Sequence, residues 1–175
     1  MISKEINNVY VQLLITLNHI SVIIIFFTAV WIFGDVIGRY FFNQPIPGTT
    51  ELVKTAIIAI VFLGFPYALY KKAHIRTMMV TQRLSPKITK WLEILSSVIG
   101  IVIFTLVCIY GWEAAIKAWD VNEFEGVQLR IPTYPSRFIM VLGSALLVIQ
   151  YLIELFKSLR TTITEKNKGE NEWPV

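Results

Sequence analysis

Cysteine and histidine are scarce in this 175-residue sequence, which contains one cysteine and two histidines. The single cysteine, Cys108, excludes an intrachain disulfide, a Cys-x-x-Cys redox pair and a thiolate zinc cluster. His19 and His74 are expected to be separated by most of a bilayer, so we expect neither a shared metal nor a haem held between them. The sequence also lacks a phosphate-binding glycine loop, an H-E-x-x-H helix and a Ser/His/Asp set. We therefore expect no enzyme, and no catalytic residue, metal ligand or cofactor in this chain.

Charged residues are also few, at 16% of the chain, whereas hydrophobic residues make up 55% and the mean hydropathy is +0.60. A soluble domain of this size does not need so many apolar residues. The apolar residues fall into four runs that we interpret as membrane helices, although the uncharged part of the second run, residues 55–70, is short for a helix that faces lipid. We predict a single all-α integral membrane domain, residues 1–175, with transmembrane helices at about residues 13–42, 50–71, 86–119 and 135–158 and a disordered tail from about 163 to 175.

Proline and glycine mark the boundaries between these runs. Residues 43–48, Asn-Gln-Pro-Ile-Pro-Gly, predict a tight hairpin, after which Thr49 or Thr50 can cap the next helix. Ser85 followed by Pro86 predicts the start of the third helix. The first run is longer than the roughly 20 residues that a perpendicular helix needs, so part of it should be tilted or lie in the membrane interface.

The segment between the second and third runs, residues 71–90, has basic residues and no acidic ones: Lys71, Lys72, Arg76, Arg83, Lys87 and Lys90. Because Lys and Arg near membrane ends are retained on the inner side, we predict a cytoplasmic loop here. Basic residues also follow the fourth run, so both termini are expected in the cytoplasm. We interpret the basic loop as a membrane anchor at the lipid headgroups. A specific anionic-lipid site and a contact with a partner's cytoplasmic face remain alternatives.

Four ionisable residues flank the predicted hairpin near the outer membrane face: Asp35, Arg39, Glu51 and Lys54. Such groups are costly at membrane depth unless they are paired. We predict a structural ion-pair network in which Arg39 pairs with Glu51, and Asp35 pairs with Arg39 or Lys54. An ion or proton relay and a contact with a partner subunit are the alternatives. Nearby, Gly34 and Gly38 offer a small-residue surface for close helix packing.

Short motifs around the second helix and the basic loop are Gly38-Arg-Tyr-Phe-Phe-Asn43, Pro47-Gly-Thr-Thr-Glu51, Lys72-Ala-His-Ile-Arg76 and Arg83-Leu-Ser-Pro86. In this order and spacing, they resemble the small membrane subunit, the DctQ-like component, of tripartite ATP-independent periplasmic (TRAP) transporters. Four apolar segments with both ends inside also match that family, so the resemblance extends over essentially the whole chain.

The resemblance implies a non-catalytic subunit of the bacterial inner membrane with two partners. One is a large multi-spanning subunit that carries sodium-coupled symport, and the other is a soluble periplasmic substrate-binding protein. The cargo would be an organic acid such as a dicarboxylate, a keto acid or sialic acid. In this scheme the chain scaffolds the large subunit and helps the binding protein to dock. We expect docking on two outer segments, with candidate residues Asn43, Gln44, Thr49, Asp120, Glu123, Glu125 and Arg130.

The main alternative is a self-sufficient, proton-coupled exporter made of four helices. It would need a central membrane carboxylate, whereas Asp35 and Glu51 are expected too near the outer face. A membrane redox enzyme fits less well, because its chemistry usually needs cysteine pairs or facing histidines.

Overall fold

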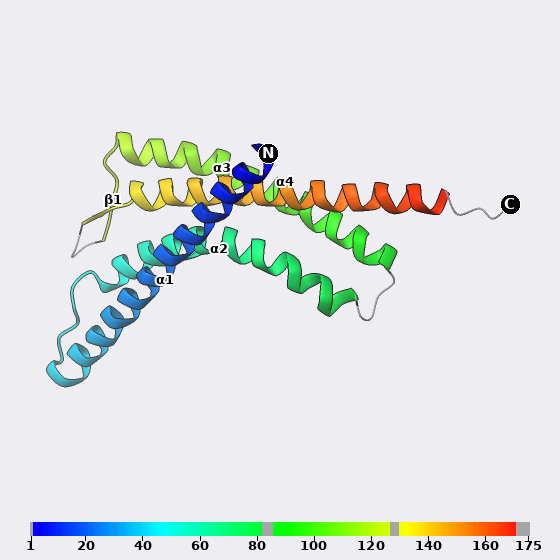
Figure 1. Ribbon diagram of the computed structural model, residues 1–175. Coiled ribbons are helices and arrows are strands. Elements are labelled where there is room, and N and C mark those ends of the chain that lie inside the picture. The colour runs from blue at the N-terminus through cyan, green and yellow to red at the C-terminus, as the bar shows by residue number, and fades with distance from the viewer. Residues whose placement is uncertain (1, 82–85, 127–129, 171–175) are drawn as a thin grey trace.

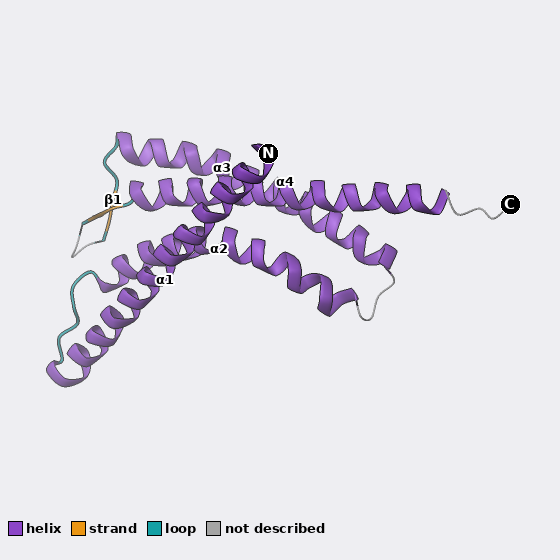
Figure 2. Ribbon diagram, in the orientation of Figure 1, coloured by secondary structure: helices purple, strands orange, loops and turns teal. Residues whose placement is uncertain are grey.

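The computed structural model describes residues 2–81, 86–126 and 130–170. In these residues the chain forms long helices and one short pair of antiparallel strands, in which Phe124 lies opposite Pro132 (Figures 1 and 2). The elements are α1 (Ile2–Phe42), α2 (Thr49–Thr81), α3 (Pro86–Asp120), β1 (Phe124–Glu125), β2 (Ile131–Pro132) and α4 (Tyr134–Glu170).

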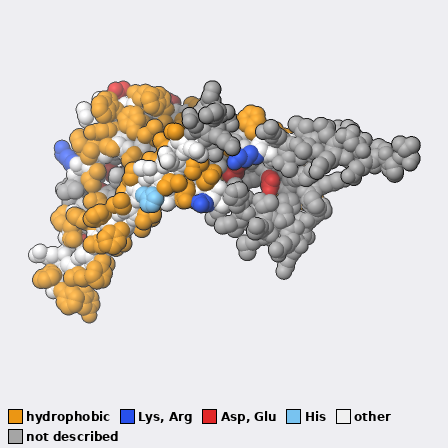
Figure 3. All heavy atoms as spheres, in the orientation of Figure 1, with side chains coloured by type: hydrophobic (Ala, Val, Ile, Leu, Met, Phe, Trp, Pro, Cys, Tyr) orange, Lys and Arg blue, Asp and Glu red, His pale blue; other side chains and the backbone are white. Residues whose placement is uncertain are grey.

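Each helix contains a stretch that is long and apolar enough to cross a membrane. Among the described residues these candidate spans are Asn8–Phe42, Thr49–Lys71, Trp91–Asp120 and Tyr134–Leu159. Figure 3 shows one face of the molecule, on which hydrophobic side chains cover most of the described surface. The predicted all-α membrane fold with four spans is therefore confirmed. The placement of both termini in the cytoplasm stays a prediction.

The helices continue beyond their predicted ends. α2 runs to Thr81 and α3 begins at Pro86, so most of the segment predicted to be a loop, residues 71–90, is helical. α4 runs to Glu170, so residues 163–170 of the predicted disordered tail are helical as well. Hydropathy reports where the membrane ends, whereas a helix stops where its backbone is interrupted, most often at proline or glycine. Neither residue occurs between Pro66 and Pro86.

The four helices do not form a compact bundle. α3 packs along α4, α2 packs against α4, and α1 packs against α2 while crossing the others obliquely (Figure 1). The span of α1 has 35 residues, which is about 52 Å at 1.5 Å per residue and longer than the roughly 30 Å hydrocarbon core. An oblique path fits such a helix into the membrane. As a result, the end of α1 near Phe42 lies away from α3 and α4.

Glycines and alanines allow the close contacts with α4. A Cβ atom on Gly143 would collide with the backbone carbonyl oxygen of Phe62 on α2, and a Cβ on Gly100 of α3 would lie 2.6 Å from the ring of Tyr151. Ala115 and Ala118 of α3 are fully buried. Small side chains let membrane helices approach closely, which is how van der Waals packing holds them together in lipid.

Gly34 and Gly38, predicted to serve helix packing, face the connection after α1 within the described residues, and their use in packing stays a prediction. A Cβ on Gly34 would be 3.9 Å from its nearest neighbour, the side chain of Ile46, and a Cβ on Gly38 would be 2.9 Å from the carbonyl oxygen of Gln44. Both neighbours belong to the connection between α1 and α2. Gly38 therefore makes room for the hairpin that follows α1, because the chain turns back over the end of its own helix, whereas a side chain at Gly34 would meet only ordinary contact.

Candidate functional site

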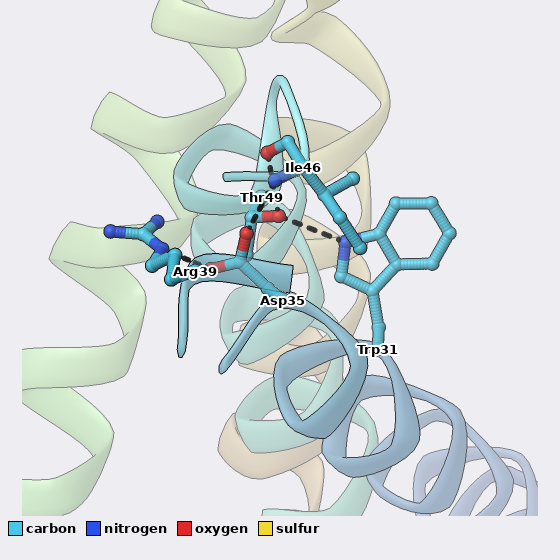
Figure 4. Close-up of polar contacts among 5 residues, drawn as sticks. All are labelled: Trp31, Asp35, Arg39, Ile46 and Thr49. Carbon is cyan, nitrogen blue, oxygen red and sulfur yellow. Dashed lines mark hydrogen bonds and ion pairs between the residues drawn. The ribbon is translucent and has the colours of Figure 1, made fainter. Parts of the chain in front are cut away.

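The connection between α1 and α2, residues 43–48, is held by a buried carboxylate. Asp35 is 5% exposed. Its Oδ1 accepts a hydrogen bond from the backbone N–H of Ile46 at 2.7 Å, and its Oδ2 accepts one from Nε of Arg39 at 2.8 Å (Figure 4). Prolines 45 and 47 have no N–H group to donate, which leaves Ile46 as the donor between them. Both oxygens of Asp35 are thus engaged in fixing the hairpin.

Thr49, the first residue of α2, completes this polar cluster. Its hydroxyl donates to the carbonyl oxygen of Ile46 at 3.0 Å and accepts from Nε1 of Trp31 at 3.2 Å (Figure 4). Thr49 is only 7% exposed. We predicted it as a docking residue, but its side chain is buried and binds its own chain. The reason is the turn at residues 43–48, which folds the start of α2 onto Trp31.

The turn itself is tight, as its prolines and glycine predicted. The backbone N–H of Gln44 donates to the carbonyl oxygen of Gly38 at 3.2 Å. Asn43 and Gly48 adopt positive φ angles of 53° and 80°, and asparagine and glycine are the residues that tolerate this conformation best. Asn43 and Gln44 are exposed. Of the predicted docking residues in this hairpin, these two are accessible to a partner.

A second hairpin connects α3 to α4 and contains β1 and β2. Thr133 donates to the carbonyl oxygen of Glu123 through its backbone N–H at 3.0 Å and through its hydroxyl at 3.2 Å. Arg137, in the first turns of α4, binds the Glu123 carboxylate at 2.8 Å and the carbonyl oxygen of Ala114 at 2.9 Å. One guanidinium therefore joins the end of α3, the hairpin and the start of α4. Our sequence reasoning missed Arg137, although a basic residue shortly after an acidic loop was a usable signal.

An ion pair connects the start of α2 to the second hairpin. Nζ of Lys54 on α2 lies 2.9 Å from Oε1 of Glu125 on β1, and about half of each side chain is exposed. We expected Lys54 to pair with Asp35 if it joined the network at all. The structure brings Asp35 and Arg39 together and gives Lys54 a partner 71 residues away. We call this end of the molecule, with residues 43–50, 120–126 and 130–133, the hairpin end.

Arg39 and Glu51 do not form the predicted ion pair among the described residues. Both line a shallow pocket of about 320 Å³ beside the first hairpin, together with Pro45 and Gly48. Arg39 uses its Nε for Asp35 and is otherwise more than half exposed. The two remaining predicted docking residues, Asp120 and Arg130, are exposed at the second hairpin.

The predicted membrane anchor lies at the opposite end of α2 and α3. Lys71 is exposed, and its Nζ is 5.8 Å from the centre of the Tyr67 ring. The side chains of the other predicted anchor residues lie outside the described part of the structure, and Arg83 lies outside it entirely. These residues are Lys72, Arg76, Arg83, Lys87 and Lys90.

The structure describes the chain over residues 2–81, 86–126 and 130–170. Within these described ranges, no three metal-ligating side chains come together. The polar side chains at the hairpin end bind one another and the backbone, so they hold two loops in fixed positions at one end of an apolar body.

Comparison with known proteins places this arrangement in a context. A family model described as "Tripartite ATP-independent periplasmic transporters, DctQ component" matches residues 28–161. The match covers most of the chain and includes both hairpins and the four helices in whole or in part. A search of curated proteins found no significant match.

Proposed function

Because this chain belongs to the DctQ component family of tripartite ATP-independent periplasmic transporters, we propose that it scaffolds the large transport subunit and helps the periplasmic substrate-binding protein to dock. The chain is a multi-pass membrane protein and a component of a transporter. In this proposal the cargo is an organic acid, and the cargo site and the sodium coupling belong to the large subunit and the binding protein.

The ion pair between Lys54 and Glu125 carries the docking proposal. It holds the start of α2, which directly follows the first loop, against the second loop, so that both loops can face the same partner. Each loop is also held from within, the first by Asp35 and the second by Arg137. Loops that are ordered before binding lose less conformational entropy when a partner docks. Two fixed polar loops on one end of a membrane protein suit repeated, reversible contact with a soluble protein.

The charge distribution supports an orientation in which the hairpin end faces the periplasm. Basic residues dominate the opposite end, between α2 and α3 and after the span of α4, and such residues are retained in the cytoplasm. Aromatic rings gather near the hairpin end, where the centroid of the Trp119 ring lies 4.8 Å from that of Tyr134 and 6.4 Å from that of Phe138. Such rings favour the headgroup layer. Both termini are then cytoplasmic.

A self-sufficient proton-coupled exporter is less consistent with the geometry. Asp35 is the most buried of the predicted carboxylates, and both of its oxygens bind groups that hold the hairpin. Glu51 lies in the first turn of α2 beside the open pocket at that end. Neither carboxylate is placed at the middle of a span. Purified chain alone in liposomes should therefore carry no substrate flux, and unaided flux would favour the exporter.

The docking proposal is tested by charge reversal at Asp120, which is exposed and pairs with no described residue. The complex with the large subunit is reconstituted in liposomes, and the initial uptake rate is titrated with binding protein. Since charges at the rim of an interface act on association, Asp120→Lys should shift the half-saturating concentration several-fold, and Asp120→Asn should shift it less. Lys71→Gln at the opposite end is the matched control. Docking at this hairpin would be refuted if Asp120→Lys and Arg130→Glu, each tested as a single variant, both left the titration unchanged.

A further inference from the structure

Three polar side chains of α1 are exposed along one stripe of the helix: Gln12, Thr16 and His19. Their spacing of four and three residues places them on the same face. The buried residues of α1 recur every seven residues, at Leu14, Ser21, Thr28 and Asp35, and mark the opposite face. On that packed face the Ser21 hydroxyl donates to the carbonyl oxygen of Ile60 on α2 at 2.9 Å. The polar stripe therefore points away from the rest of this chain.

The stripe lies within the membrane. His19 lies 23 residues before Phe42, where the candidate span ends, and 11 residues after Asn8, where it begins. If this span fills the roughly 30 Å hydrocarbon core on its oblique path, each residue covers about 0.9 Å of depth, so His19 lies about 20 Å from the outer boundary and about 10 Å from the inner one. Thr16 and Gln12 follow toward the inner boundary. All three lie within the candidate span Asn8–Phe42.

Lipid tails cannot satisfy these side chains. Nδ1 of His19 is 2.8 Å from the carbonyl oxygen of Ile15, so in the neutral ring this nitrogen carries the proton and Nε2 keeps an unused acceptor. The Thr16 hydroxyl donates to the carbonyl oxygen of Gln12 at 2.9 Å. The amide side chain of Gln12 binds no described residue. Polar groups that face hydrocarbon without partners are costly, so protein is expected to cover them.

We propose that this stripe is where α1 contacts a membrane helix of the large transport subunit, which donates a hydrogen bond to Nε2 of His19. The inference rests on the proposed function and identifies the contacting face. Beyond His19 the stripe continues through Ile23, Phe26 and Val30, which are 55%, 64% and 54% exposed. Alternating steps of three and four residues favour a helix pair that crosses at about 20° and stays in contact over its length.

A second copy of this chain is a poorer occupant. Copies in one membrane insert in the same direction, so His19 lies at the same depth in each. In a twofold dimer through this stripe, the two neutral rings would meet and each would offer an acceptor to the other. Two acceptors cannot satisfy one another, whereas a helix with a different sequence can present a donor.

Photo-crosslinking tests the contact in the assembled transporter. Benzoylphenylalanine is placed at position 19 or, as a matched control, at position 20, which is occupied by an exposed isoleucine about 100° around the helix. The chain is expressed with the large subunit and irradiated in membranes. Position 19 should give an adduct with the large subunit at least fivefold more efficiently than position 20. If the large subunit co-purifies but position 19 crosslinks only to a second copy of this chain, or to no protein at all, the inference is overturned.

Substitution gives a second, independent readout. His19→Leu should lower the amount of large subunit that co-purifies several-fold, whereas His19→Gln, which keeps an acceptor, and Ile20→Leu should preserve it. The chain itself should fold in each case, because the described hydrogen bond of His19 is to its own helix. Wild-type yield with His19→Leu would overturn the inference. If the unmodified chain retains no large subunit at all, the proposed function fails, and the inference fails with it.

Discussion

Gly143 is the point at which a single methyl group should separate two helices. A Cβ there would meet three atoms of Phe62, of which the backbone carbonyl carbon would be 2.8 Å away and the side-chain Cβ 2.6 Å away. Ordinary contact begins at 3.4 Å, so α2 would have to move away from α4 by about 1 Å, and backbone atoms cannot rotate out of the way as a side chain can. Overpacking of this kind typically costs about 1–3 kcal/mol. Alanine favours a helix interior over glycine by roughly 1 kcal/mol, so Gly143→Ala should lower the free energy of unfolding by up to about 2 kcal/mol in all.

Gly34 provides the matched control for this experiment. The nearest neighbour of a Cβ on Gly34 would be the side chain of Ile46 at 3.9 Å, which is ordinary contact. Alanine favours a helix interior over glycine by roughly 1 kcal/mol, so Gly34→Ala should leave stability unchanged or raise it slightly. Both variants are purified in detergent and unfolded by increasing denaturant while helical circular dichroism is recorded. A Gly143→Ala protein as stable as the wild type, together with a destabilised Gly34→Ala protein, would refute the assignment of packing roles to these glycines.

Two further predictions concern the hairpin end. Arg137→Ala removes the contacts with Glu123 and with the carbonyl oxygen of Ala114. It should destabilise the second hairpin by about 1–2 kcal/mol, because a partly exposed ion pair is worth less than a buried one. Amide hydrogen exchange should become faster in this hairpin, with no change at residues 43–48. Thr49→Val leaves Nε1 of Trp31 without its hydrogen-bond partner. The stability of the first hairpin should fall by about 1 kcal/mol, which is measured as faster proteolysis of that hairpin. Thr50→Val, at an exposed neighbouring residue, should leave the rate of cleavage unchanged.

The helices and the first hairpin could be predicted from the sequence because their signals are local. Apolar runs of sufficient length indicate spans, and two prolines with a glycine indicate a turn wherever they occur. The pair of Asp35 and Arg39 is also local, since residues four apart share a helix face. The helix ends were less accurate, because hydropathy falls at the membrane boundary while the backbone hydrogen bonds continue to Thr81 and Glu170.

Contacts between distant segments could not be predicted in the same way. Lys54 and Glu125 are close only because α2 packs beside the second hairpin, and spacing along the chain does not contain that information. Glycines present the same difficulty. A G-x-x-x-G spacing singled out Gly34 and Gly38, whereas Gly143 lies at the α2–α4 crossing because of how α4 is rotated about its axis. That rotation is set by the packing of the whole molecule.

The seven-residue recurrence of buried positions on α1 constrains the length of that helix. Leu14, Ser21, Thr28 and Asp35 keep one face toward α2, while the Asp35 carboxylate must meet the hairpin and His19 must face outward. Each residue added or removed turns everything beyond it by about 100° and shifts it by 1.5 Å. One deletion between His19 and Asp35 would therefore either turn the Asp35 end of α1, together with its hairpin, away from α2, or turn the stripe toward α2. Changes of seven residues, which turn the helix by only about 20°, preserve the angle between the two. The number of residues between His19 and Asp35 thus fixes the relative orientation of the two ends of α1, although these ends do not touch.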